Sequence, residues 1–246
     1  MKIGRYNRNG WVFDKLTPEL AYLIGVYLGD GCIDSTNRFR LKVIDKDFVE
    51  YTAKCILDVC GDILPVMETD ENYTYKGKTK LVHNYYLQYS KNDFVNWLRS
   101  LSDKETVPSI IPRTATLETK KFLEGLMDSE GWISMSRQIK FEKGTHRWGI
   151  GIAATSGWIR ESKDLFQKFG IRIHKEQTGV SRSGKILYSY GFNPCSFAYS
   201  GLKFNISRKQ ERLELYKKEM QIDPLRDCAP CGRHRFSPSN DTVRSL

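Results

Sequence analysis

LIGVYLGDG, residues 23–31 of the chain, comes back one hundred positions later as LEGLMDSEG, residues 123–131. Each copy has a glycine, a small residue four positions further on, then an acid and a final glycine. The two acids are Asp30 and Glu130. Because self-similarity at a fixed period is the sequence signature of repeated structural units, the chain is predicted to contain two copies of one unit.

The segments that follow the two copies also correspond to each other. Behind the first copy, residues 38–43 alternate basic and apolar side chains, as a half-buried strand does. Behind the second copy the alternation is rougher, around residues 138–141 and 147–152. Helical spacing that ends at a glycine then predicts one helix in each copy, followed by two strands and a last helix. These elements are expected at residues 48–59, 63–70, 82–90 and 92–101 in the first copy and at residues 158–169, 171–178, 185–192 and 207–220 in the second.

The chain is therefore predicted to be an α+β protein made of two pseudo-symmetric αββαββα repeats. Its 246 residues suffice for two units of roughly 100 residues each. A segment with two prolines, Pro108 and Pro112, joins the units. The expected organisation is an N-terminal extension at 1–16, a first repeat at 17–101, a linker at 102–119, a second repeat at 120–222 and a loose C-terminal tail at 223–246.

The motif segments have the composition of buried helices that pack closely. Residues 20–29 are apolar nearly all round, which is typical of a buried helix. Gly25 and Gly29 lie on one helix face, as do Gly125 and Ser129 in the second copy. Glycine costs about 1 kcal/mol in a helix interior, and small residues at this spacing let two backbones approach. We therefore expect the motif helices to meet about a pseudo-two-fold axis, with Gly25 and Gly125 at the interface and the two acids together at one end.

The paired acids suggest a metal site. Two carboxylates that lie close together repel each other unless a cation is between them. A hard divalent ion such as Mg²⁺ accepts oxygen ligands and keeps positions open for water, and such ions promote phosphodiester cleavage. The alternative is that Asp30 and Glu130 are merely helix-end residues before glycine caps. An acid is unfavourable there, because a helix C-terminus already carries partial negative charge, so a functional role is favoured for both.

The charge of the chain indicates a polyanionic partner. Its 39 Lys and Arg residues exceed its 29 Asp and Glu residues, and the resulting net charge of +10 is typical of proteins that bind nucleic acid. A merely soluble basic protein is the alternative. No apolar run reaches the roughly 18 residues of a membrane span, and no apolar signal segment follows the first residues. The expected location is the cytoplasm, or the nucleus or organelle that holds the host genome.

The six cysteines have no regular spacing, so reduced and mostly buried thiols are expected rather than a disulfide framework. In the tail, Cys228 and Cys231 are followed by His234, which resembles half of a zinc site. A closed site needs four ligands, and no second pair lies nearby in the sequence. A disordered basic tail is therefore the favoured interpretation, and a zinc site is the alternative.

At its two motifs, the sequence resembles the LAGLIDADG family of homing endonucleases in its monomeric, two-motif form. The similarity extends over the motif neighbourhoods Thr17–Gly25 and Phe122–Gly131, and over Val107–Pro112 ahead of the second motif. It covers roughly residues 17–220. Two motifs in register are specific, whereas a single motif would be a weaker indication.

The resemblance implies a saddle of two four-stranded antiparallel sheets over DNA, with the motif helices packed at the interface. It implies an intron-encoded, divalent-metal-dependent endonuclease that cuts both strands of a long asymmetric target across the minor groove and leaves 3′ overhangs. Carried over to this sequence, the metal acids are Asp30 and Glu130, with Gly29 and Ser129 as the neighbouring metal-site positions. Two or three Mg²⁺ ions shared between the acids are expected, and Mn²⁺ or Ca²⁺ can substitute in binding.

The resemblance also implies a basic residue beside the scissile phosphates, after the second strand of each repeat. Lys46 matches that position in the first repeat and is expected to be catalytic. The corresponding residues 153–156 of the second repeat contain no lysine. The helper of the second half is left open, with Lys175 and Lys185 as weak candidates.

The outward polar residues of the strands and their turns are expected to contact double-stranded DNA, with one chain per duplex. Lys and Arg neutralise phosphates, and Arg and Gln read base edges from a β-ribbon in the major groove. For any single residue, a solvated strand face is an equally good interpretation. The expected DNA-binding residues are Arg38, Arg40, Lys42, Lys76, Lys78, Lys80, Gln88, Gln138, Lys140, Arg147, Lys175, Gln177, Arg182 and Lys185.

Two other functions are open on the same fold. Some members of the family are maturases, which bind intron RNA and assist splicing. A DNA-binding protein without catalytic activity is the second alternative, although the presence of both acids argues against it. Self-splicing, which accompanies family members embedded in inteins, is not expected, because the chain lacks a terminal His-Asn pair.

Overall fold

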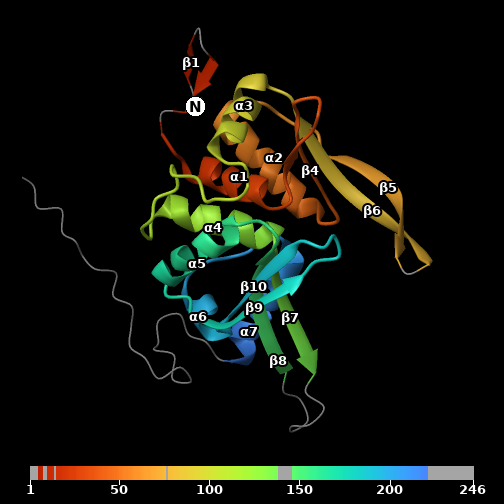
Figure 1. Cartoon of the computed structure of the whole chain (residues 1–246), viewed down its shortest axis with the longest axis vertical. Helices are drawn as coiled ribbons and strands as arrows, with labels where there is room; N and C mark the ends of the chain where they lie inside the picture. The colour runs from red at the N-terminus through yellow and green to blue at the C-terminus, as the bar shows by residue number, and fades with distance from the viewer. Residues whose placement is uncertain (1–4, 8–9, 14, 76, 138–145, 221–246) are drawn as a thin grey trace, which may run out of the picture.

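The structure, a computed structural model, describes residues 5–7, 10–13, 15–75, 77–137 and 146–220 (Figure 1). No helix within these ranges is both long and apolar enough to cross a membrane. Several residues singled out in the sequence lie outside the described ranges. They are the expected DNA-binding residues Lys76, Gln138 and Lys140 and the tail residues Cys228, Cys231 and His234.

The two motif segments form helices that lie side by side in the middle of the molecule, α1 (Pro18–Leu28) and α4 (Leu117–Ser129) (Figure 1). Both begin in the same way. The hydroxyl of Thr17 accepts a hydrogen bond from the Leu20 amide, and the hydroxyl of Thr116 accepts one from the Thr119 amide, each at 3.2 Å. Such caps satisfy amides that have no partner within the helix. Every residue from Leu20 to Leu28 is buried, as the apolar composition predicts.

Each repeat contributes one four-stranded antiparallel sheet. The strands follow the order β3-β4-β6-β5 in the first sheet and β7-β8-β10-β9 in the second, so corresponding strands occupy corresponding places. The predicted fold class is confirmed. The first sheet contains β3 (Cys32–Ile33), β4 (Phe39–Val43), β5 (Met67–Tyr75) and β6 (Lys78–Tyr89), and the second contains β7 (Gly131–Arg137), β8 (His146–Ala154), β9 (Ile173–Val180) and β10 (Ile186–Phe192).

Helices cover one face of each sheet. In β4, Phe39 and Leu41 are fully buried on the helix side, while the alternate residues Arg40 and Lys42 lie on the opposite face. Helix α2 packs on β4 and β6, and α5, α6 and α7 pack on β10, β8 and β7. The bounds of these helices, and of α3, are α2 (Lys46–Cys60), α3 (Asn92–Leu101), α5 (Trp158–Lys168), α6 (Pro194–Tyr199) and α7 (Ser207–Glu219).

The second repeat departs from the sequence prediction in two places. Its first strand, β7, starts at Gly131 directly after the motif rather than near residue 138. The outward residues of β7 are Trp132, Ser134 and Ser136, so the basic alternation used for prediction is missing there. In addition, α6 follows β10 in the place that α3 takes after β6, which makes α7 an extra helix. A short helix led by a proline gives too little periodicity to be recognised.

The N-terminal extension contains a hairpin that the sequence did not predict, β1 (Arg5–Asn7) and β2 (Gly10–Val12). Strands of three residues are too short to show an alternating pattern. Beyond the hairpin, the ring of Phe13 packs against Phe94 and Trp97 of α3, with ring centroids 5.9 and 4.6 Å apart. The extension is thereby anchored to the first repeat.

The cysteines agree with the prediction in part. Cys55 and Cys60 are free and buried, and burial raises the pKa of the Cys55 thiol to about 12 and that of Cys60 to about 11. Cys32 is free and exposed. Cys195 is disulfide-bonded, which the expectation of reduced thiols did not include.

Candidate active site and nucleic-acid interface

The motif helices meet at their glycines with no room for a side chain. A Cβ atom on Gly125 would lie 2.5 Å from the carbonyl oxygen of Tyr22, and one on Gly25 would meet the carbonyl oxygen of Phe122 equally closely. Positions 22 and 122, and 25 and 125, are corresponding positions of the two repeats. The contact is therefore reciprocal about a pseudo-two-fold axis, and the predicted packing of the motif helices is confirmed.

This seam brings the two acids to the same end of the helix pair. A Cβ atom on Gly29 would collide with the Ser129 side chain and lie 3.3 Å from Cγ of Glu130. Glu130 is the C-cap residue of α4, and Asp30 follows Gly29, the C-cap residue of α1. Asp30 is exposed and Glu130 is half-buried. The site thus opens to solvent at the point where both motif helices end.

The two carboxylates influence each other's ionisation. Burial is the largest cause that raises the pKa of Glu130 to about 7, and the negative charge of Asp30 adds to it. The protein around Asp30 also removes water from its carboxylate, which raises its pKa to about 6. Positive charges on Lys104 and Lys209 act in the opposite direction on both acids. The two lysines therefore compensate only part of the effect, because the pKa values of both carboxyls remain raised.

Lys104 and Lys209 are the pair of basic residues that the sequence analysis missed. The Lys104 ammonium donates hydrogen bonds to the carbonyl oxygens of Gly29 and Gly31 at the end of α1. The Lys209 ammonium donates to the carbonyl oxygens of Met127 and Asp128 at the end of α4, at 3.1 and 2.6 Å. Burial lowers the pKa of both lysines.

Their symmetry could not be recognised from spacing. Lys104 lies in the linker and Lys209 in the first turn of α7, at 74 positions after Asp30 and 79 positions after Glu130, although the short stretches around them, LSDKE at 101–105 and ISRKQ at 206–210, correspond. Each lysine nevertheless neutralises the negative end of its own motif helix. The signal in the sequence was the short shared stretch after each sheet, in which a lysine follows a serine by two positions.

The same two segments tie each repeat to the other. Beside Lys104, the Glu105 carboxylate accepts a hydrogen bond from the Gly157 amide at the start of α5, at 2.9 Å. Beside Lys209, the Arg208 guanidinium forms a bidentate pair with Asp45 at the start of α2, at 2.5 and 2.8 Å. Each segment therefore contacts its own motif helix and the second helix of the opposite repeat.

Asp128 is a second residue that the sequence did not single out. Its side chain is buried and accepts hydrogen bonds from the Tyr22 hydroxyl at 2.8 Å and from the side-chain amide of Asn205 at 2.9 Å. Burial raises the pKa of this carboxyl to about 6. Asp128 thus links α4 to α1 and to the segment that leads to Lys209.

Lys46, which the sequence suggested as the catalytic basic residue beside the scissile phosphates, lies in the first turn of α2. Its ammonium pairs with Glu50 at 3.7 Å and lies 5.8 Å from the ring centroid of Tyr85. The structure brings Asp30, Glu130, Gly29 and Ser129 together, and it does not bring Lys46 to them. Among the second-half candidates, Lys175 lies on β9 and Lys185 follows the turn between β9 and β10.

The uncovered face of the first sheet carries most of the expected DNA-binding residues of that repeat. The strand register pairs Arg40 with Gln88 and Lys42 with Tyr86, and the even-numbered residues of β6 continue on this face through Lys80 to Lys78. Two acidic side chains form ion pairs with some of these basic residues and neutralise part of the positive charge. Asp34 pairs with Arg38 at 3.1 Å and with Arg40 at 3.8 Å, and Glu71 pairs with Lys42.

The second sheet presents a less charged face. Lys175 and Gln177 point outward opposite Gly191 and Ser189, and Arg182 at the hairpin turn donates a hydrogen bond to the Tyr73 hydroxyl of the first repeat at 3.2 Å. Arg147 occupies a position in β8, but its side chain lies outside the described part of the structure. The two halves therefore carry different chemistry on the same framework.

The residues present fit a divalent ion held by few protein ligands. Within the described residues no cluster of three or more His, Cys, Asp or Glu side chains could hold a metal. Asp30 and Glu130 would supply carboxylate oxygens. The remaining ligands of the metal would be oxygen atoms of backbone carbonyls, water and phosphate, which Mg²⁺ prefers. The buried Ser129 hydroxyl beside them has no hydrogen-bond partner among the described residues, so a polar group at the same place could still accept a ligand.

No family model matches the chain. It is 26% identical over 235 residues to an uncharacterized protein of Methanocaldococcus jannaschii, a match that covers 87% of this chain and 77% of that protein. It is also 26% identical over 230 residues to the isomerizing glutamine–fructose-6-phosphate aminotransferase of the same organism, where the match covers 83% of this chain and only 18% of that protein.

Two solved structures are similar to this chain in fold. One is the homing endonuclease I-WcaI bound to its DNA recognition sequence, with a TM-score of 0.48, 14% identity and coverage of 81% of this chain and 87% of that one. The other is the N-terminal LAGLIDADG domain of WhiA, with a TM-score of 0.41, 13% identity and coverage of 82% and 83%. The repeated element order, the paired motif helices and the two four-stranded sheets of this chain agree with the fold that the resemblance of its two motifs implies.

Proposed function

We propose that this protein is a site-specific DNA endonuclease that hydrolyses one phosphodiester bond in each strand and depends on a divalent metal ion. The proposal rests above all on the reciprocal site at the end of the helix seam. That site holds two carboxylates and two half-buried or buried lysines, one carboxylate and one lysine at the end of each motif helix. A duplex has two strands to be cut, and a two-fold arrangement of acids and lysines matches that requirement.

The parts of the chain have distinct roles in this proposal. Asp30 and Glu130 hold divalent metal ions, which activate water and stabilise the charge that develops on the phosphate oxygens. The ammonium groups of Lys104 and Lys209 add positive charge beside the scissile phosphates. The seam at Gly25 and Gly125 fixes the separation of the acids, because backbone packed against backbone has little freedom to shift. The open sheet faces bind the duplex on either side.

A cleavage assay tests the proposal. A plasmid carrying a target selected by the protein from a randomised DNA pool is incubated with the protein and Mg²⁺, and with Mg²⁺ plus EDTA. We expect linear DNA with 3′ overhangs in the first reaction and uncut DNA in the second. Binding without cleavage in Mg²⁺ and in Mn²⁺ would instead assign a DNA-binding protein without catalytic activity, and selective binding of structured RNA would favour a maturase.

The assignment of the basic residues gives a prediction of its own. Lys104→Met and Lys209→Met should each slow cleavage by about 10²–10³-fold, which is typical of the loss of one electrostatic donor from an active site. Nicked plasmid should accumulate, because each lysine serves one end of the reciprocal site. Gel analysis of supercoiled, nicked and linear plasmid measures both effects.

Lys46→Met is the matched comparison, since the sequence favoured Lys46 whereas its ammonium lies beside Glu50 and Tyr85. We expect its cleavage rate to stay within about tenfold of wild type, as for a phosphate contact away from the reacting bond. Melting temperatures identify any loss of folding in Lys209→Met. A large loss in Lys46→Met with none in Lys104→Met would restore the assignment made from the sequence.

A single chain should act on an asymmetric target. Both repeats belong to one polypeptide, and Arg40 and Lys42 of the first sheet correspond by register to Gly151 and Ala153 of the second. The two halves therefore cannot prefer the same half-site. Analytical ultracentrifugation of the DNA complex should give one chain per duplex, and target selection should give a non-palindromic sequence. Two chains per site or a perfect palindrome would refute this expectation.

A further inference from the structure

One cross-strand row differs completely between the two uncovered sheet faces. In the first sheet, Cys32, Arg40 and Gln88 stand opposite one another across β3, β4 and β6. Each of these positions has a counterpart in the second sheet. The first counterpart follows the motif acid by two residues, as Cys32 follows Asp30, and the other two are its cross-strand partners in the register of the second sheet. Those counterparts are Trp132 on β7, Gly151 on β8 and Gly191 on β10.

In the second sheet the indole of Trp132 lies over Gly151, the counterpart of Arg40, and over Gly149, the next outward residue of β8. A Cβ atom on Gly151 would lie 2.6 Å from Cζ2 of Trp132, and one on Gly149 would lie 2.8 Å from Cζ3. Atoms along the six-membered ring thus rest directly on both glycines. Trp132 is nevertheless 37% exposed, so the indole also faces the surface of the sheet that we propose binds DNA. A tryptophan in this setting is unusual for a solvated strand face.

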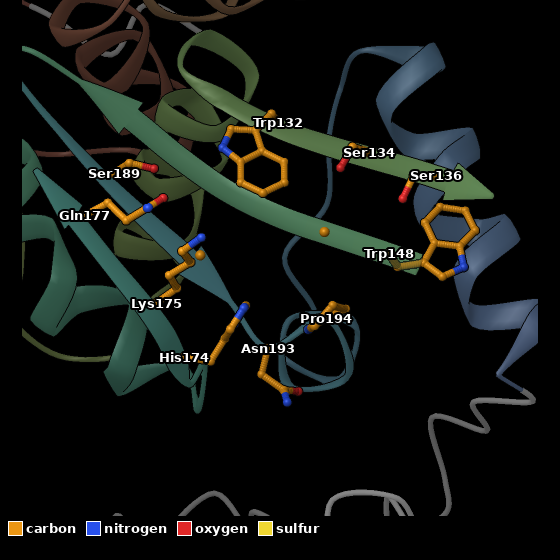
Figure 2. Close-up of a pocket in the computed structure, with 12 residues that line it drawn as sticks. Trp132, Ser134, Ser136, Trp148, His174, Lys175, Gln177, Ser189, Asn193 and Pro194 are labelled. Atoms are coloured by element: carbon orange, nitrogen blue, oxygen red, sulfur yellow. The ribbon is translucent and has the colours of Figure 1, made fainter. Parts of the chain in front are cut away.

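Figure 2 shows the hollow that this arrangement leaves on the sheet. It has a volume of about 470 Å³, and Trp132 lies at one end of it, with Ser189 and Gln177 close by and Lys175 along its lower side. Ser134 lies on the far side of the indole. The hollow therefore combines apolar surface from Trp132, Trp148 and Pro194 with neutral polar groups, the imidazole of His174 and the positive charge of Lys175.

The chemistry of this row favours one feature of DNA. Reading a guanine edge in the major groove needs a long donor such as Arg, and reading an adenine needs Asn or Gln. Gly151 and Gly191 have no side chain for either contact, whereas Arg40 and Gln88 of the first sheet are side chains of the two required kinds. The group in the major groove that pairs with an apolar surface is the 5-methyl group of thymine.

We propose that Trp132 is a specificity-determining residue that reads the 5-methyl group of a thymine in the half-site bound by the second sheet, next to the cleavage centre. The inference rests on the proposed function, since it assumes that this sheet face binds DNA. Trp132 follows Glu130 by two residues, so the thymine lies near the inner end of that half-site. Lys175, at the other end of the row, contacts the backbone phosphate rather than the base.

The test compares thymine with uracil, which differs from it only by the methyl group. Duplexes selected by the wild-type protein are resynthesised with each thymine replaced singly by uracil, and dissociation constants are measured in Ca²⁺. We expect one position, in one half-site only, where uracil weakens wild-type binding about fourfold, as expected for burial of one methyl-sized group. Elsewhere the replacement should have no effect.

Variants connect that position to the indole. In Trp132→Ser the uracil effect should disappear, while in Trp132→Phe, which keeps an apolar ring, most of it should remain. Cys32→Ser, at the corresponding position of the first repeat, is the matched control and should keep the full effect. Melting temperatures and the sequence preference of the other half-site, unchanged in Trp132→Ser, show that this variant is folded.

The outcomes separate this inference from the proposed function. A wild-type protein that binds and cuts its target but tolerates uracil at every position overturns the inference alone. The same follows if Trp132→Ser retains the uracil effect, or if Trp132 variants weaken binding equally on thymine and uracil, which would indicate stacking instead. A wild-type protein that binds no duplex overturns both the inference and the proposed function.

Discussion

Asp30→Asn and Glu130→Gln should each reduce double-strand cleavage by at least about a thousandfold. Metal ions held by the carboxylates supply several kcal/mol of transition-state stabilisation, and each 1.4 kcal/mol corresponds to a tenfold change in rate. The substitutions keep the shape of the side chain and remove the charge. Single-turnover cleavage of the selected target in Mg²⁺ measures the effect, with the rate of each strand followed separately.

Binding provides the internal control for this prediction. In the proposed function the two acids lie beside the phosphates that are cut, so removal of a negative charge should leave the DNA affinity unchanged or slightly increased. Because burial raises the pKa of both carboxyls, and the charge of Asp30 adds to the effect on Glu130, the neutral variants should also fold as stably as the wild type. If either variant cuts at the wild-type rate, the acids are not the metal ligands and the proposed mechanism is wrong.

Gly25→Val should impair cleavage more than it impairs folding. The added side chain would meet the backbone of α4 at Phe122, Gly125 and Leu126, and backbone atoms cannot turn aside as a flexible side chain can. Overpacking of this kind typically costs about 1–3 kcal/mol, or roughly 2–12 °C in melting temperature for a protein of this size. The helices would have to separate, and a misplacement of about 1 Å can cost around a hundredfold in rate.

Gly179→Val is the matched control for the seam. Gly179 lies in β9, a Cβ atom there would have nothing within 4 Å, and its backbone is not in the left-handed region. The same substitution should therefore leave the melting temperature near its wild-type value, and, since Gly179 shares a sheet face with Gln177, cleavage is compared at protein concentrations that saturate the DNA, where the rate should also stay near wild type. Gly125→Val, the pseudo-symmetric counterpart of Gly25→Val, should reproduce its defect. Wild-type cleavage by Gly25→Val would show that the seam does not position the acids.

The sequence was sufficient to predict those elements whose position is determined by interactions between residues close together in the chain. Apolar positions at helical spacing, and a glycine that can adopt a positive φ, predicted α2 and its end at Gly61, where φ is 75°. The alternation of β4 predicted which of its residues are buried and which form the open face. The prediction of β7 failed because its outward residues are not basic. The prediction of α6 failed because the helix is too short to show a period.

By itself, the sequence determined the repeat, the close helix seam and the identity of the two acids, because small residues and carboxylates recur at matching positions within nine-residue segments. Only the tertiary structure decided which basic residues accompany the acids. Lys104 reaches Gly29 from 75 positions away and Lys209 reaches Asp128 from 81, and no local spacing encodes such contacts. Likewise, the glycines under Trp132 come from β8, and their meaning depends on strand register. Contacts of this kind arise when separate elements pack, so they are a property of the folded chain rather than of any segment in it.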